Sequence, residues 1–333
     1  GNGFIGSNLV KFLLKKKFFV INIDNNKYSN GSYLLKKISK KNYKFIQLNI
    51  NNKKIFNILS SYKPVALFNL AAETHVDRSI DSPKEFVQSN ILGTFNILEQ
   101  LRKYKKKYKR KIKLIHVSTD EVYGDLKNLS RSNENSPYKP SSPYSASKAS
   151  ADHLIKSYIR TYKIDAAISN CCNNYGPGQF PEKLIPTLIF NIMRNASLPI
   201  YGKGKNSREW IHVEDHCKGL FLIFKKGKIG ESYNIGTGNN INNLNLTKLL
   251  LKILRKKIKI GNKVRIKFVK DRPGHDYKYA LNSKKIMNQL NWRPTKKFRD
   301  GLEETFDWYI KNFMFFKFFS KRNFFKRLGL KND

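Results

Sequence analysis

The sequence predicts an α/β protein that combines a doubly wound parallel β-sheet with a smaller, irregular α+β lobe. The chain opens on a glycine-rich loop, which a helical segment at Asn8–Lys16 and an apolar segment at Phe18–Ile23 follow in that order. Apolar and helical segments then alternate up to about residue 175, which is the pattern of parallel strands joined by helical crossovers. Beyond that point, turns rich in Gly and Pro interrupt short helical segments. The change in pattern indicates two unequal lobes.

The glycine-rich loop has glycines at positions 1, 3 and 6, the G-x-G-x-x-G spacing of a dinucleotide-binding loop. Asp24 ends the strand expected after the loop, close to where such sites place the carboxylate that binds the adenosine ribose. Three nearby glycines alone often form only a turn. The helix, the strand and the acidic residue in this order nevertheless predict a dinucleotide site on a Rossmann-type sheet. We expect the strand that normally precedes such a loop to be absent from this chain.

The remaining elements of the sheet follow from the alternation of apolar and helical segments. We expect strands at Tyr43–Ile50, Val65–Leu70, Lys113–Ser118 and Asp165–Asn170, and helices at Lys53–Tyr62, Pro83–Tyr104 and Tyr144–Tyr162. Ligands of such sheets bind at the carboxyl ends of the strands. Three segments fall there and are expected in the site: Ala71–Thr74, Thr119–Glu121 and Asn173–Asn174.

Composition limits the function classes. The net charge is +41, but the Lys and Arg residues are dispersed without a basic stripe, and Lys, Asn and Phe are abundant throughout, as an AT-rich genome would produce. We therefore expect neither nucleic acid nor a membrane as a partner. No apolar run reaches the length of a membrane span. Cys171, Cys172 and Cys217 cannot all pair within the chain and lack metal-ligand spacing, which indicates a reducing cytoplasm and no metal site.

Two short motifs carry the candidate chemistry. Tyr144 and Lys148 stand four residues apart on a predicted helix, where both side chains share one face and an ammonium lowers the pKa of a nearby phenol. Alone, this pair is common on helix surfaces. Thr119, Asp120 and Glu121 follow a predicted strand at the ligand edge of the sheet, although such residues also form solvated turns. The adjacent carboxyl groups supply an acid and a base that hydride transfer alone does not need. Together the motifs indicate an enzyme that oxidises its substrate and then eliminates water.

With these motifs, the chain resembles the extended short-chain dehydrogenases/reductases and, among them, the dTDP-glucose 4,6-dehydratase family. The resemblance runs from Gly1 to about Tyr309, and its main segments are Leu70–Ser79, Asn173–Pro177, Phe180–Pro186 and Asp271–His275. It implies a hydro-lyase with NAD as cofactor. In the implied cycle, Tyr144, with Lys148 and Thr119 beside it, removes the proton of the C4 hydroxyl during oxidation. Glu121 is then the base at C5, Asp120 is the acid at the C6 hydroxyl, and hydride returns to C6.

The resemblance also implies the binding residues. Those expected to contact the cofactor are Gly3, Phe4, Ile5, Gly6, Asp24, Asn25, Asn26, Lys27, Asn49, Ile50, Leu70, Ala71, Ala72, Thr74, Ser89, Tyr144, Lys148 and Asn174. Those expected to contact the nucleotide-sugar substrate are Thr74, Thr119, Asn173, Lys183, Leu184, Pro199, Ile200, Tyr201, Arg208, Asn243, Asp271, Arg272 and His275. Arg208 and Arg272 would bind the pyrophosphate, since a guanidinium binds phosphate oxygens bidentately. Asn49 stands where family members commonly carry Asp, and Thr74 replaces the commoner Ser.

We divide the chain into an NAD-binding Rossmann-like domain at 1–175 and a substrate-binding lobe at 176–312, some segments of which return to the sheet. Residues 313–333 form a basic, aromatic tail of unknown role, for which docking on its own domain or on a partner subunit is favoured over an interfacial membrane helix. If the resemblance holds, helices Pro83–Tyr104 and Tyr144–Tyr162 form the four-helix interface of a homodimer.

Two alternatives remain open at this stage. One is another nucleotide-sugar 4,6-dehydratase or a 4-epimerase of the same fold. Epimerases need no acid and base at C5 and C6, so Asp120 and Glu121 argue against them. The other is a decayed enzyme that acts as a basic binding protein, which the intact catalytic motifs disfavour.

Overall fold

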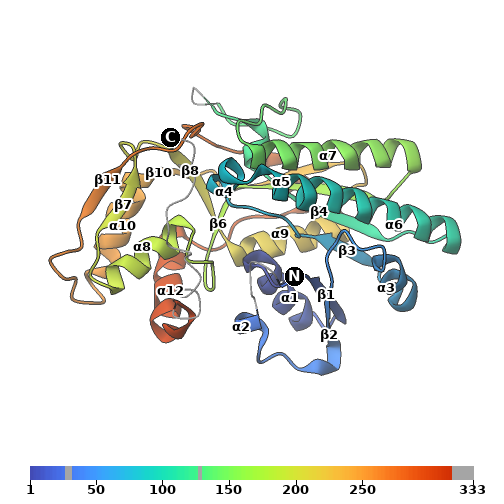
Figure 1. Ribbon diagram of the computed structural model, residues 1–333, viewed down its shortest axis with the longest axis horizontal. Coiled ribbons are helices and arrows are strands. Elements are labelled where there is room, and N and C mark those ends of the chain that lie inside the picture. Colours follow the sequence, from blue (N-terminus) through green and yellow to red (C-terminus); the bar gives the residue numbers. More distant parts are fainter. Residues whose placement is uncertain (27–31, 127–129, 317–333) are drawn as a thin grey trace.

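The computed structural model describes residues 1–26, 32–126 and 130–316 of the chain (Figure 1). Its centre is a four-stranded parallel sheet of β3 (Ala66–Asn69), β4 (Lys113–Thr119), β5 (Ala166–Cys171) and β9 (Ser232–Ile235), in the order β3-β4-β5-β9. Every residue of β5 is buried. Strands covered on both faces read as nearly continuous apolar runs, which is why the sequence revealed them. Strand β9 comes from the later part of the chain and pairs with β5.

A second parallel pair consists of β1 (Val20–Asp24) and β2 (Tyr43–Gln47), in register from Val20 opposite Tyr43. Helix α1 (Phe4–Lys15) precedes β1, as the glycine-loop pattern predicts. In the described ranges, no strand pairing joins β1 or β2 to the four-stranded sheet. The parallel α/β architecture predicted from the sequence is confirmed.

Helices cover both faces of the sheet because neighbouring strand residues point to opposite sides. Leu114 of β4 packs with apolar residues of α3 (Ile55–Tyr62), α6 (Gly93–Tyr108) and α7 (Pro143–Tyr162). Ile115, the next residue, packs in the other cluster, to which α1 and α9 (Val213–Lys226) contribute. Figure 1 shows α6 and α7 on one side of the strands and α1 and α9 on the other. The two clusters together fix the layers that carry the site.

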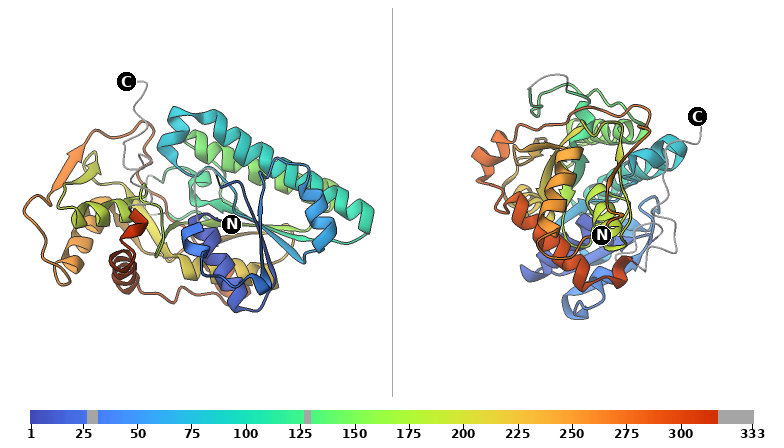
Figure 2. Two further views of the ribbon diagram at one scale, coloured as in Figure 1. Left: turned by 60° about the horizontal axis from the view of Figure 1, so that its bottom comes forward. Right: turned by 90° about the vertical axis from the view of Figure 1, so that its left-hand side faces the viewer.

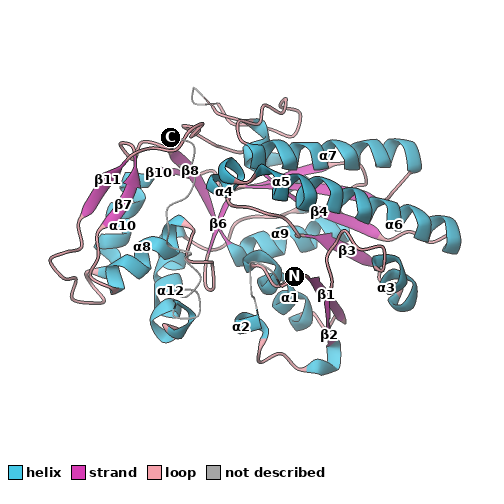
Figure 3. Cartoon of the chain, in the orientation of Figure 1, coloured by secondary structure: helices cyan, strands magenta, loops and turns pink. Residues whose placement is uncertain are grey.

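The later part of the chain builds smaller sheets. Strand β8 (Ser207–His212) lies between β6 (Asn173–Tyr175), to which it is parallel, and β10 (Asn240–Asn242), to which it is antiparallel. Strands β7 (Leu198–Tyr201) and β11 (Ile266–Val269) form a separate parallel pair. The helices of this region are α8 (Leu184–Met193), α10 (Asn243–Leu254), α11 (Lys284–Leu290) and α12 (Phe298–Lys311). The pair β7 and β11 with α8 and α10 lies at one end of the molecule, away from the far end of α6 (Figure 2, Figure 3).

The prediction of one regular helix at Pro83–Tyr104 is wrong, both because the helix is interrupted and because it ends later. The structure has α5 (Pro83–Phe86), a π-helical turn at Val87–Leu92 and then α6, which continues to Tyr108. The expected strand at Tyr43–Ile50 stops at Gln47, because the Asn49 side chain accepts a hydrogen bond from the Asn51 N–H (2.9 Å) and turns the backbone. Short elements not predicted are α2 (Ser32–Leu35), α4 (Val76–Asp81) and 3₁₀ turns at Lys40–Asn42 and Asp120–Tyr123.

The first residues of the predicted tail pack on the chain itself. Phe315 and Phe316 are fully buried, and the Phe316 ring stacks on Tyr309 with 4.7 Å between centroids. Phe190 of α8 lies against the other side of this cluster. The rest of the tail, residues 317–333, lies outside the described residues. Among the helices that the structure describes, none has the length and apolar character needed to cross a membrane.

Candidate active site

The end of β4 places the three residues of the Thr-Asp-Glu motif. Thr119 is the last residue of the strand, and Asp120 and Glu121 begin the 3₁₀ turn that follows. The Thr119 hydroxyl accepts a hydrogen bond from the Glu121 N–H (3.3 Å), as an N-cap residue does. Gly124 ends the turn at φ 78°, and a Cβ there would overlap the Lys139 carbonyl oxygen. The cap at Thr119 therefore fixes the start of the turn, and the close approach of Gly124 to Lys139 fixes its end.

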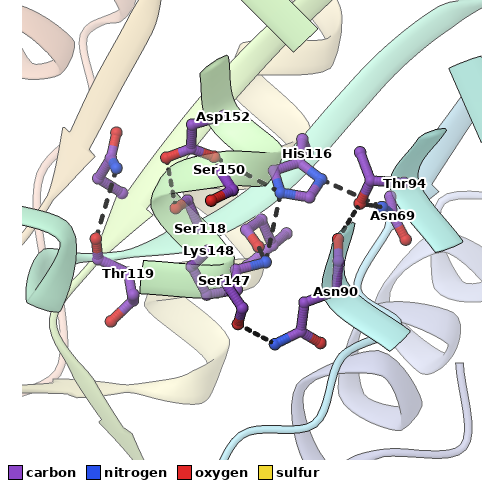
Figure 4. Close-up of polar contacts among 12 residues, drawn as sticks. Asn69, Asn90, Thr94, His116, Ser118, Thr119, Ser147, Lys148, Ser150 and Asp152 are labelled. Carbon is purple, nitrogen blue, oxygen red and sulfur yellow. Dashed lines mark hydrogen bonds and ion pairs between the residues drawn. The ribbon is translucent and has the colours of Figure 1, made fainter. Parts of the chain in front are cut away.

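Helix α7 brings Tyr144 and Lys148 to the same strand. Ser142 and Ser145 form a capping box that starts the helix just before Tyr144. The Lys148 ammonium donates to the Val117 carbonyl oxygen of β4 (2.8 Å) and lies 3.3 Å from Nε2 of His116 (Figure 4). Both Tyr144 and Lys148 are buried. The contact of α7 with β4 therefore joins the two motifs that the sequence places far apart.

The environment of Tyr144 disfavours ionisation of its phenol to the phenolate. Burial raises the pKa of Tyr144 well above its ordinary value, the charge of Glu121 raises it further, and the Thr119 hydroxyl acts in the opposite direction. The lowered phenol pKa expected from the Tyr144 and Lys148 spacing is therefore not found in the protein alone. The reason is that burial penalises the charged phenolate more than its polar neighbours stabilise it.

Asp120 and Glu121 are adjacent in sequence but differ in environment. Burial raises the pKa of Asp120 well above the usual range, and the negative charges of Glu121 and Glu209 add to this. Its Oδ1 accepts from the Thr119 hydroxyl (3.2 Å), while its buried Oδ2 has no partner among the described residues. Burial also raises the pKa of Glu121, but Arg272, Arg208 and Lys183 act against it. Two neighbouring carboxyl groups whose environments act differently on their pKa values can serve as a proton donor and a proton acceptor.

Beside Glu121 lies a cavity of about 240 Å³. The predicted substrate contacts that line it are Thr74, Asn173, Lys183, Leu184, Pro199, Ile200, Tyr201, Arg208, Asn243, Arg272 and His275. Thr119 and Asp271 belong to the predicted set but do not line it, and neither do Asp120, Tyr144 and Lys148. The cavity therefore collects residues of β6, β7, β8, α8 and α10 around one catalytic candidate.

Cationic side chains give the cavity its charge. Nη1 of Arg272 lies 2.6 Å from Oδ1 of Asp77, whose other oxygen accepts from the Tyr201 hydroxyl (3.0 Å). Arg208 donates to backbone carbonyl oxygens, and the described residues place no carboxylate within 4.0 Å of its guanidinium. Lys183 donates to the Thr74 carbonyl oxygen (2.8 Å). Such an arrangement suits an anionic ligand such as a diphosphate.

His275 lines the same cavity in its neutral form. Its Nδ1 lies 2.6 Å from Oδ1 of Asp271, so Asp271 acts on the cavity through His275. Burial lowers the pKa of His275 to about 4, and the charges of Arg272 and Arg208 contribute to the shift. At neutral pH the imidazole can therefore donate or accept hydrogen bonds without adding charge.

The predicted contacts omitted eight residues that line the cavity: His75, Val76, Asp77, Gln179, Glu182, Thr187, Trp210 and Tyr279. Asp77 lies in the segment Leu70–Ser79, which resembles the family, so the sequence offered evidence that could have placed Asp77 at the site. Tyr279 supports Arg208, whose guanidinium lies 4.4 Å from the centre of the phenol ring. This pairing of positions distant in sequence has no local signal.

The glycine loop fits a dinucleotide phosphate. Helix α1 starts after Gly3, and no side chain caps its first N–H groups, which remain available to an anion. A Cβ on Gly6 would lie 2.8 Å from the Gly1 backbone, so the close turn requires glycine there. Asp24 accepts hydrogen bonds from the N–H groups of Asn2 (2.8 Å) and Asn26 (2.9 Å). The carboxylate thus orders the loop from the end of β1.

The remaining predicted cofactor contacts lie on several elements. Phe4 and Ile5 open α1, Asn25 follows β1, and Asn49 and Ile50 follow β2; Leu70, Ala71 and Ala72 follow β3; Ser89 stands in the π-helical turn, and Asn174 in β6. The Asn174 amide donates to the Cys172 carbonyl oxygen (3.0 Å), and its Oδ1 lies 2.9 Å from Nδ1 of His216. Lys27 lies outside the described residues. In those residues, no group of three or more His, Cys, Asp or Glu side chains could hold a metal ion.

The raised pKa of Asp120 predicts a pH-dependent cost to stability. Above the ordinary value of 3.8, the folded protein holds a proton that the unfolded chain releases, so this carboxyl destabilises the fold as pH rises toward its folded pKa. Asp120→Asn should therefore gain stability over the wild type by up to about 1.4 kcal/mol per pH unit in that range. Denaturant unfolding from acid to neutral pH measures this. The exposed Asp300→Asn is the control, and equal slopes for both variants would contradict the prediction.

The model of the GDP-mannose 4,6 dehydratase family matches residues 1–305 of the chain. The probable dTDP-glucose 4,6-dehydratase of Sinorhizobium fredii is 43% identical over 321 residues, covering 94% of this chain and 91% of the relative. The dTDP-glucose 4,6-dehydratase of Salmonella typhimurium is 43% identical over 330 residues, with the same coverage of 94% and 91%.

Solved structures show the same likeness. A double mutant of dTDP-glucose 4,6-dehydratase from Streptomyces venezuelae, with NAD and DAU bound, has a TM-score of 0.86 and 38% identity, covering 94% of this chain and 95% of that one. UDP-glucose 4-epimerase from Thermotoga maritima, with UDP-glucose, has a TM-score of 0.83 and 27% identity, covering 94% and 97%. The chain therefore belongs to the GDP-mannose 4,6 dehydratase family and, within it, to the dTDP-glucose 4,6-dehydratases.

Proposed function

We propose that this protein is an NAD-dependent hydro-lyase that converts dTDP-glucose to dTDP-4-keto-6-deoxyglucose. The observation that carries the proposal is the contrast between Asp120 and Glu121 at the end of β4. One carboxyl is buried beside other negative charges, and the other faces three cations at the wall of the cavity. Relatives at 43% identity over nearly the whole chain support the choice of substrate. NAD, when bound, accepts a hydride from C4 of the sugar and returns it to C6.

The cofactor would lie against the glycine loop. Gly3 to Gly6 and the start of α1 would bind its pyrophosphate, and Asp24 would bind the adenosine ribose. Around the reacting end we assign Lys148, Tyr144 and Asn174, with Leu70 to Ala72 beneath. The uncapped helix start and the close approach at Gly6 support the placement of the pyrophosphate at the glycine loop.

Tyr144 is assigned the first proton transfer, from the C4 hydroxyl of the sugar. The hydroxyl of Thr119 favours its ionised form, whereas burial and Glu121 disfavour it. To the Lys148 ammonium we assign the electrostatic support of the phenolate during this step. The oxidised sugar carries a ketone at C4, which acidifies the hydrogen at C5. Glu121 then removes that hydrogen, and protonated Asp120 donates to the departing C6 hydroxyl. Loss of water leaves a C5=C6 double bond; with the hydride returned to C6 and the proton on Glu121 returned to C5, the sugar undergoes no net oxidation.

The nucleotide end of the substrate would occupy the cavity. Arg208 and Arg272 would bind the pyrophosphate, while Lys183, Leu184 and the β7 residues Pro199, Ile200 and Tyr201 would flank the base. The cavity lining supports this set because the residues come from different elements but face one space. Asn173, Asn243 and His275, which line the same cavity, would add hydrogen bonds.

The substrate class is tested by product mass. The protein with NAD should convert dTDP-glucose to a product lighter by one water molecule and leave UDP-glucose and GDP-mannose largely unchanged. An epimerase would instead give a product of unchanged mass, which nuclear magnetic resonance of the sugar would reveal. Faster dehydration of another nucleotide sugar would correct the assigned base. A chain that binds no nucleotide sugar would support the basic binding protein.

The division of labour is tested by three substitutions. Tyr144→Phe should prevent bound NADH from forming when substrate is added. Glu121→Gln should allow NADH to form but stall C5 deprotonation, and Asp120→Asn should slow loss of the C6 hydroxyl. Each should cost about 10²–10⁴-fold in its own step. Stopped-flow absorbance of NADH and solvent deuterium exchange at C5 separate the steps. Wild-type dehydration by Glu121→Gln would refute the assignment.

We also infer a homodimer built on α6 and α7. Large apolar side chains are exposed in the π-helical turn that precedes α6 and in the first turn of α6: Val87 (46%), Leu92 (49%) and Phe95 (44%). Because burial of such a patch drives association, Leu92→Asp should convert the dimer to a monomer in light scattering. The control is Phe268→Asp, since Phe268 on β11 is equally exposed (55%) but lies on the other lobe. A wild-type monomer would contradict the inference.

A reducing compartment, the cytoplasm, fits the thiols. Cys171, Cys172 and Cys217 are buried and unpaired in the structure, whereas proteins of oxidising compartments commonly form disulfides. A disulfide in the protein isolated without reductant would count against this location.

A further inference from the structure

Behind Lys148 lies a buried polar cluster that makes no contact with the substrate cavity. Its ionisable members are His116 on β4 and Asp152 on α7, which are 1% and 0% exposed. Asp152 stands one helical turn after Lys148, so both side chains point from the same face of α7 toward β4. Figure 4 shows the cluster, with His116 between Lys148 and Asn69.

The Lys148 ammonium has three N–H donors, and the cluster provides acceptors for two of them. One N–H is donated to the Val117 carbonyl oxygen (2.8 Å), and a second faces Nε2 of His116 (3.3 Å). Among the described residues, the third has no acceptor. The two protein acceptors therefore fix the direction of the ammonium and leave one donor for a ligand.

His116 can accept from Lys148 only as a neutral imidazole with a bare Nε2. Burial lowers the pKa of His116 well below its usual value, and the charge of Lys148 adds to this, so the ring is neutral. Its proton then sits on Nδ1, which faces the Asn69 amide at 3.1 Å. In the structure the Asn69 amide nitrogen faces this Nδ1 and also donates to the Thr94 hydroxyl (3.5 Å), which leaves the buried Oδ1 without a partner; the reversed amide orientation would present Oδ1 to the Nδ1 proton. The contact with the Lys148 ammonium thus selects the tautomer, and the reversed Asn69 orientation follows from it.

Asp152 supplies the negative charge of the cluster. Its Oδ2 accepts from the hydroxyls of Ser118 (2.7 Å) and Tyr138 (3.0 Å), and its Oδ1 lies 3.6 Å from Nε2 of His116. Burial raises the pKa of Asp152, while Lys148 and the two hydroxyls lower it. Burial lowers the pKa of Lys148, and Asp152 raises it. Each charge therefore offsets the cost of burying the other.

Few other ionisable groups act on this pair. Lys156, one helical turn after Asp152 on α7 and partly exposed, acts on Asp152. Cys171 of β5 acts on Lys148, and Tyr138 from the preceding loop contacts Asp152. The nearby Ser147 and Asn90 are neutral and bond to each other (2.8 Å). Asp152 is thus the carboxylate that balances Lys148.

We propose that Asp152 and His116 are positioning residues for Lys148: the carboxylate keeps the buried amine charged, and the imidazole holds its direction. The proposal rests on the function assigned to Lys148 above. It assigns a role in the reaction to two residues that touch neither substrate nor the cavity.

The charge effect is measured on the ligand-free protein. The ¹³Cε resonance of Lys148, followed against pH, should titrate about one pH unit or more lower in Asp152→Asn than in the wild type, because a neighbouring negative charge is lost. The alkaline limb of NADH formation from NAD and dTDP-glucose should move to lower pH by the same amount. Asp165→Asn is the matched control, because it breaks a partly exposed ion pair with Lys111 (3.2 Å) remote from the site. An unchanged Lys148 titration in Asp152→Asn would overturn the carboxylate's role.

The imidazole is tested first in the wild type and then by substitution of His116. Long-range ¹H–¹⁵N spectra of the wild type should show His116 as the Nδ1–H tautomer from acid to alkaline pH. An Nε2–H ring or a titrating one would overturn its role as acceptor. His116→Phe should weaken retention of NAD, and His116→Gln, which restores an acceptor, should recover part of it. If the wild type makes no NADH, the proposed function fails while both spectroscopic tests still decide the positioning pair.

Discussion

The packing of α7 against the end of β4 is the contact on which the site depends. It is held by the Lys148 ammonium on the Val117 carbonyl oxygen and by Ser118 on Asp152, both inside the protein. Because these bonds are buried, breaking one leaves a polar group without water, at a cost of about 1–3 kcal/mol or more for a charge. The helix therefore cannot slide along the strand. Tyr144 is held in turn beside the 3₁₀ turn that carries Asp120 and Glu121.

Burial also sets the proton chemistry of the site. Asp120, Glu121 and Tyr144 all have raised pKa values with burial as the largest cause, but their neighbours differ. Three cations face Glu121, whereas Asp120 faces mainly other carboxylates. Two groups of similar ordinary acidity are thereby separated into a donor and an acceptor. The stability lost by keeping such groups buried is a common feature of functional sites.

The cavity depends on contacts between the segment that follows β3 and the later part of the chain. Asp77 on α4 holds Arg272 and Tyr201, and Lys183 reaches back to the Thr74 carbonyl oxygen. These links cross from the segment after β3 to the later lobe, so the cavity wall exists only once both are folded. The same links place an arginine next to Glu121, which connects substrate binding to the electrostatics of the carboxyl pair.

The sequence by itself determined the parallel α/β architecture, the bounds of β1 to β5 to within a few residues, and the positions of the two motifs to which we assign the catalysis. These features are local: buried strands are apolar runs, Ser142 and Pro143 start a helix, and glycine spacing marks a phosphate loop. It did not determine the π-helical turn at Val87–Leu92, the pKa of Tyr144 or the roles of His116, Asp77 and Tyr279. Only the tertiary structure decided these, because each depends on burial and on partners from distant parts of the chain. From the sequence, a histidine among the apolar residues of a strand, such as His116, is interpreted as a packed core residue. Only the structure shows that the Lys148 ammonium lies against it.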